Sequence, residues 1–131
     1  MRIDTEMLDE LTRKAQDSPR LRMNFDLRNS ETDLSQRMLN AIEPGSVIPI
    51  HRHKRTSETV VLVRGKAVEV FYDESGHIIE SIELSSEGRC FAVNIPKGQW
   101  HTIYSHESGT VIFEVKNGAF EPMQPDDIMN Q

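Results

Sequence analysis

The chain has 131 residues and a formal net charge of −6, and 37% of its residues are hydrophobic. This length corresponds to one domain, and the acidic balance argues against nucleic acid as a partner. The sequence has no apolar run long enough to span a membrane, only one cysteine, and a start too polar and acidic for a secretory signal. We therefore expect a cytoplasmic protein that does not bind membranes.

The N-terminal segment, residues 1–19, is predicted to contain the main helix of the chain, over residues 4–16. Asp4 suits the N-cap position, and Pro19 follows the predicted helix end. The apolar residues with helical spacing are Met7, Leu8, Leu11 and Ala15. This narrow face predicts a helix that packs across the rest of the fold or at a subunit contact.

After Pro19 the apolar period changes to two, which is typical of a strand over residues 20–27. Its polar face, which includes Arg20 and Arg22, is interpreted as a solvated sheet face or an oligomer rim; binding of an anionic ligand is the alternative. This strand is a plausible exchanged or edge-pairing element of a homodimer, which is the oligomeric state we expect.

Short apolar runs separated by turn residues follow along the rest of the chain. The predicted strands cover residues 35–42, 47–53, 58–64, 67–72, 77–84, 89–95, 101–104 and 110–116. Strands without intervening helices predict an all-β barrel or double-sheet jelly roll over residues 20–118, followed by a C-terminal tail over residues 119–131.

The most informative pattern lies between residues 45 and 65, where the spacing is Gly-x5-His-x-His-x4-Glu-x6-Gly. His51 and His53 are two residues apart, so on an extended strand both side chains point to the same face. Glu58 follows across a turn and opens the next strand. Gly45 and Gly65 bracket the unit where the backbone must bend.

A second cluster, Pro96-x-Gly98-x2-His101, forms a turn that delivers a third imidazole. Three imidazoles and one carboxylate form a coordination shell for one divalent transition metal, with positions left open for water or substrate. Fe, Mn, Ni, Co and Zn all accept such donors. Ligand histidines must be neutral, so we expect metal affinity to fall below about pH 6.5.

Three further residues are candidates for lining a substrate pocket. Trp100 could wall the cavity mouth and stack on a sugar ring, although a core or rim position is the alternative. Tyr104 lies close to His101 in sequence, and Arg37 could steer an anionic substrate. Arg52 lies between the two histidines and is expected to point to the opposite face of their strand.

Two carboxylates, Glu69 and Glu114, lie in the middle of predicted strands. Their immediate neighbours are apolar, so we interpret both as solvent-facing or paired carboxylates. The alternative is that either one lines the pocket as a general base.

The two histidine clusters resemble the two signature motifs of the cupin superfamily. The first cluster matches without a gap. In the second, Gly88 lies two residues further from Pro96 than is usual, and Ser105 replaces the usual Asn. The resemblance implies an all-β cupin fold, a double-stranded β-helix or jelly-roll barrel, preceded here by a short N-terminal helix. It carries four residues over as metal ligands: His51, His53, Glu58 and His101.

A narrower resemblance, to the WbuC-type cupin fold metalloproteins, covers nearly the whole chain. It is carried by residues 18–24 (SPRLRMN), 36–44 (QRMLNAIEP), 51–53 (HRH) and 113–116 (FEVK). Members of that group occur in bacterial surface-polysaccharide gene clusters. The resemblance implies a bound metal and a sugar-related setting, without a named reaction.

We therefore expect a small-molecule ligand and metal-dependent isomerase, epimerase or lyase chemistry on a small sugar or sugar-derived substrate. An Fe(II)-dependent dioxygenase is the second hypothesis. A non-catalytic, metal-dependent sugar-binding or regulatory module is the third.

Overall fold

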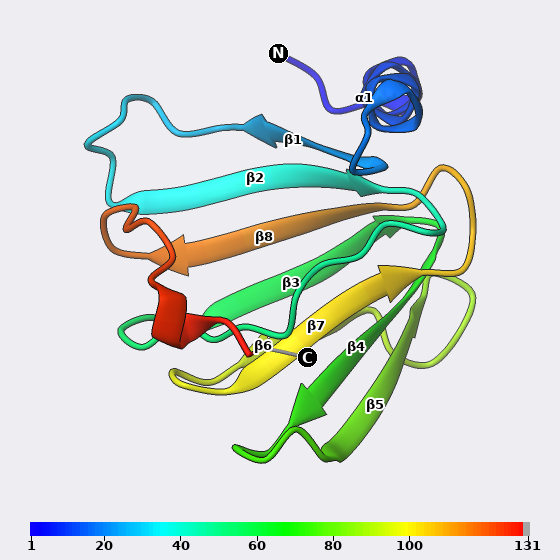
Figure 1. The fold of residues 1–131 in the computed structure, drawn as a ribbon. Coiled ribbons are helices and arrows are strands. Elements are labelled where there is room, and N and C mark those ends of the chain that lie inside the picture. Colours follow the sequence, from blue (N-terminus) through cyan, green and yellow to red (C-terminus); the bar gives the residue numbers. More distant parts are fainter. Residues whose placement is uncertain (130–131) are drawn as a thin grey trace.

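A computed structural model describes residues 1–129. Over that range it contains one α-helix, α1 (Thr5–Asp17), and two antiparallel sheets (Figure 1). The strands are β1 (Arg22–Asp26), β2 (Ser35–Ile42), β3 (Glu58–Arg64), β4 (Lys66–Tyr72), β5 (Ile78–Ser85), β6 (Ala92–Ile95), β7 (Trp100–Ser105) and β8 (Val111–Asn117). Within the same residues, no helix has the length and apolar character needed to cross a bilayer.

The two sheets enclose a common core. The larger sheet has the strand order β1-β2-β8-β3-β6, and the smaller has the order β5-β4-β7. Buried apolar side chains from both sheets pack together between them; they are Ile42, Val60, Leu62, Ala67, Leu84, Ile95, Ile103 and Ile112. This arrangement confirms the prediction of an all-β fold with one short N-terminal helix.

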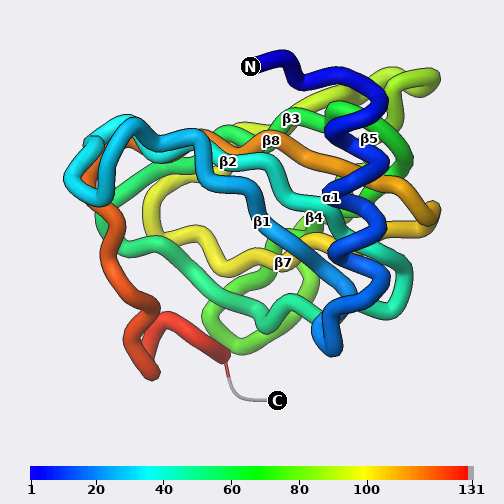
Figure 2. Tube along the Cα trace, turned by 90° about the horizontal axis from the view of Figure 1, so that it is seen from above, coloured from blue at the N-terminus to red at the C-terminus, as the bar shows by residue number. Residues whose placement is uncertain are grey.

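The helix α1 packs on the outer face of the larger sheet, beside β1 and β2 (Figure 2). The Asp4 side chain caps it by accepting a hydrogen bond from the Met7 backbone N–H at 3.0 Å. The predicted apolar stripe is buried in a second cluster, which contains Leu8, Leu11, Ala15, Leu39, Ala41 and Val111. These residues of the stripe therefore cover the sheet.

The strand register determines which side chains of the larger sheet face the interior. Glu58 of β3 pairs directly with Lys116 of β8, and Lys116 pairs with Gln36 of β2. Directly paired residues on neighbouring strands point to the same face, so these three polar side chains share one end of the interior. Further along the ladder Leu62 pairs with Ile112, both in the apolar core. The barrel thus has one polar end and one apolar end.

The expected strand over residues 47–53 is absent, and this prediction was wrong. His51 makes only isolated bridges, one with His101 and one with Ile128. Pro49 interrupts the run, and proline has no N–H to donate to a ladder. The segment still brings His51 and His53 to the same site, as described below.

Gly65 forms the tight turn between β3 and β4 with φ +92°. A Cβ atom here would lie 2.3 Å from Oγ1 of Thr110, so both the backbone conformation and the close approach require glycine. The predicted bend at this position is confirmed.

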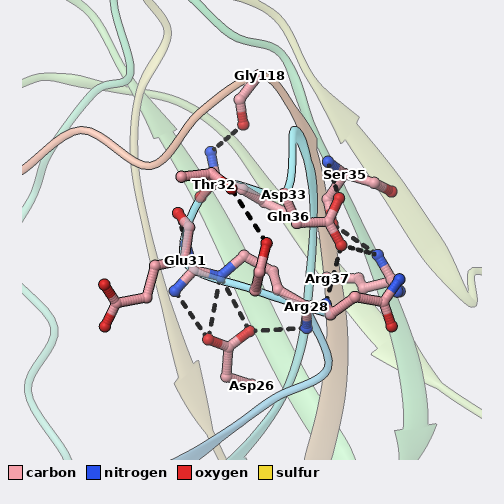
Figure 3. Close-up of polar contacts among 11 residues, drawn as sticks. Asp26, Arg28, Glu31, Thr32, Asp33, Ser35, Gln36, Arg37 and Gly118 are labelled. Atoms are coloured by element: carbon pink, nitrogen blue, oxygen red, sulfur yellow. Dashed lines mark hydrogen bonds and ion pairs between the residues drawn. The ribbon is translucent and has the colours of Figure 1, made fainter.

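The C-terminal segment folds back over the polar end of the barrel (Figure 1) and contains the 3-10 turn η1 (Pro125–Asp127). Its start is held by Gln36, whose side-chain N–H donates to the Gly118 carbonyl at 2.8 Å (Figure 3). Its end is held by Met129, whose backbone N–H donates to the Ile50 carbonyl at 2.8 Å. The tail is thereby placed beside the histidine-bearing segment.

Candidate metal centre

Three imidazoles meet at the polar end of the barrel. One ring nitrogen from each of His51, His53 and His101 lies within 4.8 Å of the others. Reciprocal backbone hydrogen bonds join His51 and His101, with N···O distances of 3.0 and 2.8 Å. The Gly98 N–H donates to the His53 carbonyl at 2.8 Å, so the turn of the second motif is bonded directly to the first.

Glu58 completes the cluster from the first position of β3. Its Oε2 atom lies 3.3 Å from Nε2 of His53 and 3.8 Å from Nε2 of His101, and only 4% of the residue is exposed. All four residues predicted as ligands are therefore brought together, although they are spread over 51 positions of the sequence.

Hydrogen bonds to the outer ring nitrogens orient two of the imidazoles. Nδ1 of His51 lies 2.8 Å from the Pro49 carbonyl oxygen, which can only accept, so Nδ1 carries the proton and Nε2 keeps a free lone pair. Nδ1 of His101 lies 2.6 Å from Oε1 of Glu69. An oxygen acceptor behind a histidine in this way fixes the tautomer and the ring orientation of a metal ligand.

Glu69 is thus a part of the site that the sequence prediction placed elsewhere. The expectation of a solvent-facing carboxylate was wrong, because 0% of Glu69 is exposed; the expectation of a paired one is met by His101. Its neighbours Val68 and Val70 are also buried. Because β4 is the central strand of its sheet, burial on both faces removes the alternation on which the prediction depended.

The protonation states of the cluster suit cation binding. Burial lowers the pKa of His51 and of His101 to about 4, so both rings are neutral at pH 7. Burial works to raise the pKa of Glu58, but His53 and the charge of Lys116 hold it below its usual range. Neutral imidazoles beside an ionised carboxylate are the forms that bind a divalent metal.

Two other interior carboxyl groups favour their protonated form. Burial, with a contribution from the charge of Glu58, raises the pKa of Glu69 to about 9. Removal from water and the same negative charge also raise the pKa of Glu114. Glu114 occupies the position two residues before Lys116 on β8 and therefore the same face of the strand. The interior thus holds groups that can store protons beside the histidine cluster.

The donor atoms fit a transition-metal ion. Among residues 1–129, Oε2 of Glu58 and Nε2 of His101 are buried without a hydrogen-bond partner. Such orphaned atoms are costly unless a ligand satisfies them. Imidazole nitrogen and carboxylate oxygen are the donors that Zn, Fe, Mn, Co and Ni share, so the donor set fits a divalent metal without selecting one.

A cavity of about 710 Å³ opens beside the cluster, and His53 is part of its wall. Its basic lining comes from Arg52, Lys54, Arg55 and Lys116, and the C-terminal segment supplies much of the opposite wall. This volume accommodates a small organic ligand.

The structure does not bring the three predicted pocket residues to this cavity. Trp100 and Tyr104 alternate with His101 on β7 and so lie on its other face. The Trp100 ring is covered by the guanidinium of Arg52 at 4.6 Å, and Tyr104 is 41% exposed.

Arg37 lies on β2 and pairs with Asp33 at 3.2 Å (Figure 3). It lines a separate cavity of about 190 Å³ rather than the one beside His53. The sequence prediction instead missed Lys116. Its signals were its place in the run 113–116 (FEVK) and its position two residues from Glu114, which acquires meaning once the pairing with Glu58 is known.

Comparison with known protein families identifies the family of this chain. A family model described as "Domain of unknown function (DUF6016)" matches residues 3–84, so the chain belongs to this family. A search of curated proteins found no match.

Solved structures share the fold. KdgF from Halomonas sp. is 16% identical, with a TM-score of 0.62, over 79% of this chain and 84% of its own. A cupin 2 domain-containing protein from Halorhodospira halophila is 20% identical, with a TM-score of 0.62, over 81% of this chain and 72% of its own. The predicted cupin fold is thereby confirmed.

A third solved structure has a higher sequence identity to this chain than the two above. The capsular polysaccharide assembling protein CapF from Staphylococcus aureus is 28% identical over 81% of this chain, with a TM-score of 0.63. The match covers only 29% of CapF, so it corresponds to one part of that larger protein.

Proposed function

We propose that this member of the DUF6016 family is a divalent-metal-dependent enzyme acting on a small sugar or sugar-derived substrate, by isomerisation, epimerisation or elimination. The observation that carries the proposal is the convergence of His51, His53, His101 and Glu58 beside a cavity of about 710 Å³. An open cavity beside ligand atoms that lack hydrogen-bond partners is typical of a catalytic rather than a purely structural metal site.

His51, His53, Glu58 and His101 would hold the metal. When bound, such an ion supplies Lewis-acid polarisation of a substrate oxygen. Glu69 orients the His101 ring through the 2.6 Å contact at Nδ1. Glu114 lies on the same face of β8 as the cavity-lining Lys116, and burial raises its pKa, so it is the candidate proton donor to substrate carbon or oxygen.

The polysaccharide setting rests on two likenesses. CapF, at 28% identity, is described as a capsular polysaccharide assembling protein. The sequence motifs also resemble WbuC-type cupin fold metalloproteins, and we propose membership of that group. Both support a role in bacterial surface-polysaccharide metabolism.

Elemental analysis of the purified protein tests the metal part of the proposal. We expect about one transition-metal ion per chain in the wild type and a large loss in His51→Ala. His77→Ala is the matched control, because the His77 side chain is exposed, lies outside the cluster and pairs with Asp73. Equal metal content in wild type and His51→Ala would reject the coordination set.

Turnover assays of the metal-loaded protein test the catalytic part. A panel of sugars, sugar acids and nucleotide sugars is followed by NMR for isomerised, epimerised or dehydrated products. Oxygen uptake after anaerobic loading with Fe(II) would instead favour a dioxygenase. Tight binding of a sugar by calorimetry without chemical change would favour a binding module.

We also propose a homodimer formed through β1. This strand is at the edge of the five-stranded sheet and has a free pairing side. Light scattering should give about twice the chain mass of 15.0 kDa; a value near 15.0 kDa would reject the dimer.

A further inference from the structure

Lys116 is placed at the boundary between the metal cluster and the cavity. It is the direct ladder partner of Glu58, the carboxylate of the cluster. It also lines the same cavity as His53. The side chain is half-buried on the same sheet face as Glu58, and its charge helps to hold the pKa of Glu58 below its usual range.

The other cations that line the cavity already have acidic partners from the C-terminal segment. Oδ1 of Asp127 lies 3.6 Å from Nε of Arg52 and 3.1 Å from Nζ of Lys54. Oε1 of Glu121 lies 2.9 Å from Nη1 of Arg55. Among residues 1–129, the Lys116 ammonium forms no hydrogen bond or ion pair within normal distance. An ammonium group on a cavity wall without a bonded acceptor is available to an anionic ligand or to water.

We propose that Lys116 anchors the carboxylate of the substrate, and that the substrate is therefore a sugar acid or related hydroxy acid. This assignment rests on the metal-dependent function proposed above. A carboxylate held by Lys116 places the neighbouring oxygens of the same small molecule toward His53 and the rest of the cluster. Lys116 is thus a specificity-determining residue.

A carboxylate fits this position better than a phosphate. Lysine presents a compact single charge, which one carboxylate balances. Bidentate recognition of phosphate favours the guanidinium group of arginine, and Arg52 and Arg55 both face acidic side chains of the tail. Within the described part of the chain, residues 1–129, the cavity therefore offers one cation without a directly bonded acidic partner rather than a cluster.

Calorimetry of metal-loaded protein with two matched pairs of probes tests the proposal. The pairs are D-glucuronate with D-glucose, and glycolate with ethylene glycol. We expect the wild type to prefer the acid in at least one pair, and Lys116→Met to weaken binding of that acid about tenfold or more. Lys116→Arg should keep the preference, and so should Lys66→Met, which removes an exposed lysine on β4.

Equal weakening of the acid and of its neutral partner in Lys116→Met would overturn the assignment, and so would equal binding of the acid by Lys116→Met and wild type. So would the absence of any acid preference in the wild type, or tighter binding of D-glucose 6-phosphate than of D-glucuronate. If Lys116→Met does not fold, the wild type alone is decisive: the acid affinity, but not that of its neutral partner, must fall between 0.05 and 0.5 M salt.

Metal content is measured on the same samples, and the acids are also titrated into metal-free protein. A wild type without metal that still prefers the acid through Lys116 rejects the proposed metal-dependent function and keeps the anion site. Normal metal content without acid preference rejects the anion site alone.

Discussion

Oε1 of Glu69 and Nδ1 of His101 lie 2.6 Å apart inside the barrel, so a strand of the smaller sheet supports one of the proposed metal ligands from behind. Glu69→Ala should therefore weaken metal binding about 10- to 100-fold, because the imidazole loses its orienting partner. Competition with a chromophoric chelator measures this change. Glu83→Ala, an exposed carboxylate on β5, is the control. An unchanged affinity in Glu69→Ala would rule out this role.

The raised pKa of Glu69 predicts a pH dependence of stability in the metal-free protein. Its pKa is about 9 in the folded state, against an ordinary value near 4.5. The folded state therefore binds a proton that the unfolded state does not, and the resulting stabilisation is present below about pH 4.5 and is lost as the pH rises toward 9. The wild type should gain stability relative to Glu69→Gln as the pH falls from 8.5 to 5. Urea unfolding measures the difference; a pH-independent difference would contradict the prediction.

Metal should stabilise the fold, because only the folded chain assembles the four donors. At a free metal concentration about 100 times the Kd, the free energy of unfolding should rise by about 2.7 kcal/mol. For a domain of this size that corresponds to a rise in Tm of about 10 °C. Chelator should reverse the shift, and His51→Ala should show little of it in calorimetric scans.

The turn at Gly65 predicts a local packing defect. Gly65→Ala combines a positive φ with a Cβ atom 2.3 Å from Oγ1 of Thr110, and we expect a loss of at least about 2 kcal/mol. Gly98→Ala has a similar φ of +78° but nothing within 4 Å of its Cβ. Chemical denaturation of both variants separates the clash from the backbone cost. Equal losses would mean that the contact with Thr110 is unimportant.

Spacing in the sequence was sufficient for the fold class and for grouping the four donor residues. Two histidines at positions i and i+2 share a face even in the irregular segment that contains Pro49, so the error about the strand over residues 47–53 did not affect that grouping.

Positions that depend on long-range register were harder to predict. Glu69 has apolar neighbours that are buried on both faces of β4, which removes the alternation that normally separates inside from outside. Lys116 becomes informative only through its pairing with Glu58, which lies 58 residues earlier in the chain. Trp100 and Tyr104 are near His101 in sequence, but the alternation of β7 turns them away from it.

The pH at which the ligand histidines are expected to become protonated also changes once their burial is known. An ordinary imidazole titrates near pH 6.5, but burial lowers the pKa of His51 and His101 to about 4. Both rings should therefore remain neutral in the metal-free protein down to about pH 5. Nitrogen NMR of the imidazoles tests this; midpoints near pH 6.5 for these two residues would contradict the buried geometry.

A crystal structure of the metal-loaded protein, with anomalous diffraction measured at the absorption edge of the bound element, tests the coordination set most directly. We predict a single anomalous peak within bonding distance, about 2.0–2.3 Å, of nitrogens from His51, His53 and His101 and of a Glu58 oxygen. An ion held elsewhere, or no peak after soaking in excess metal salt with these side chains ordered, would contradict the account.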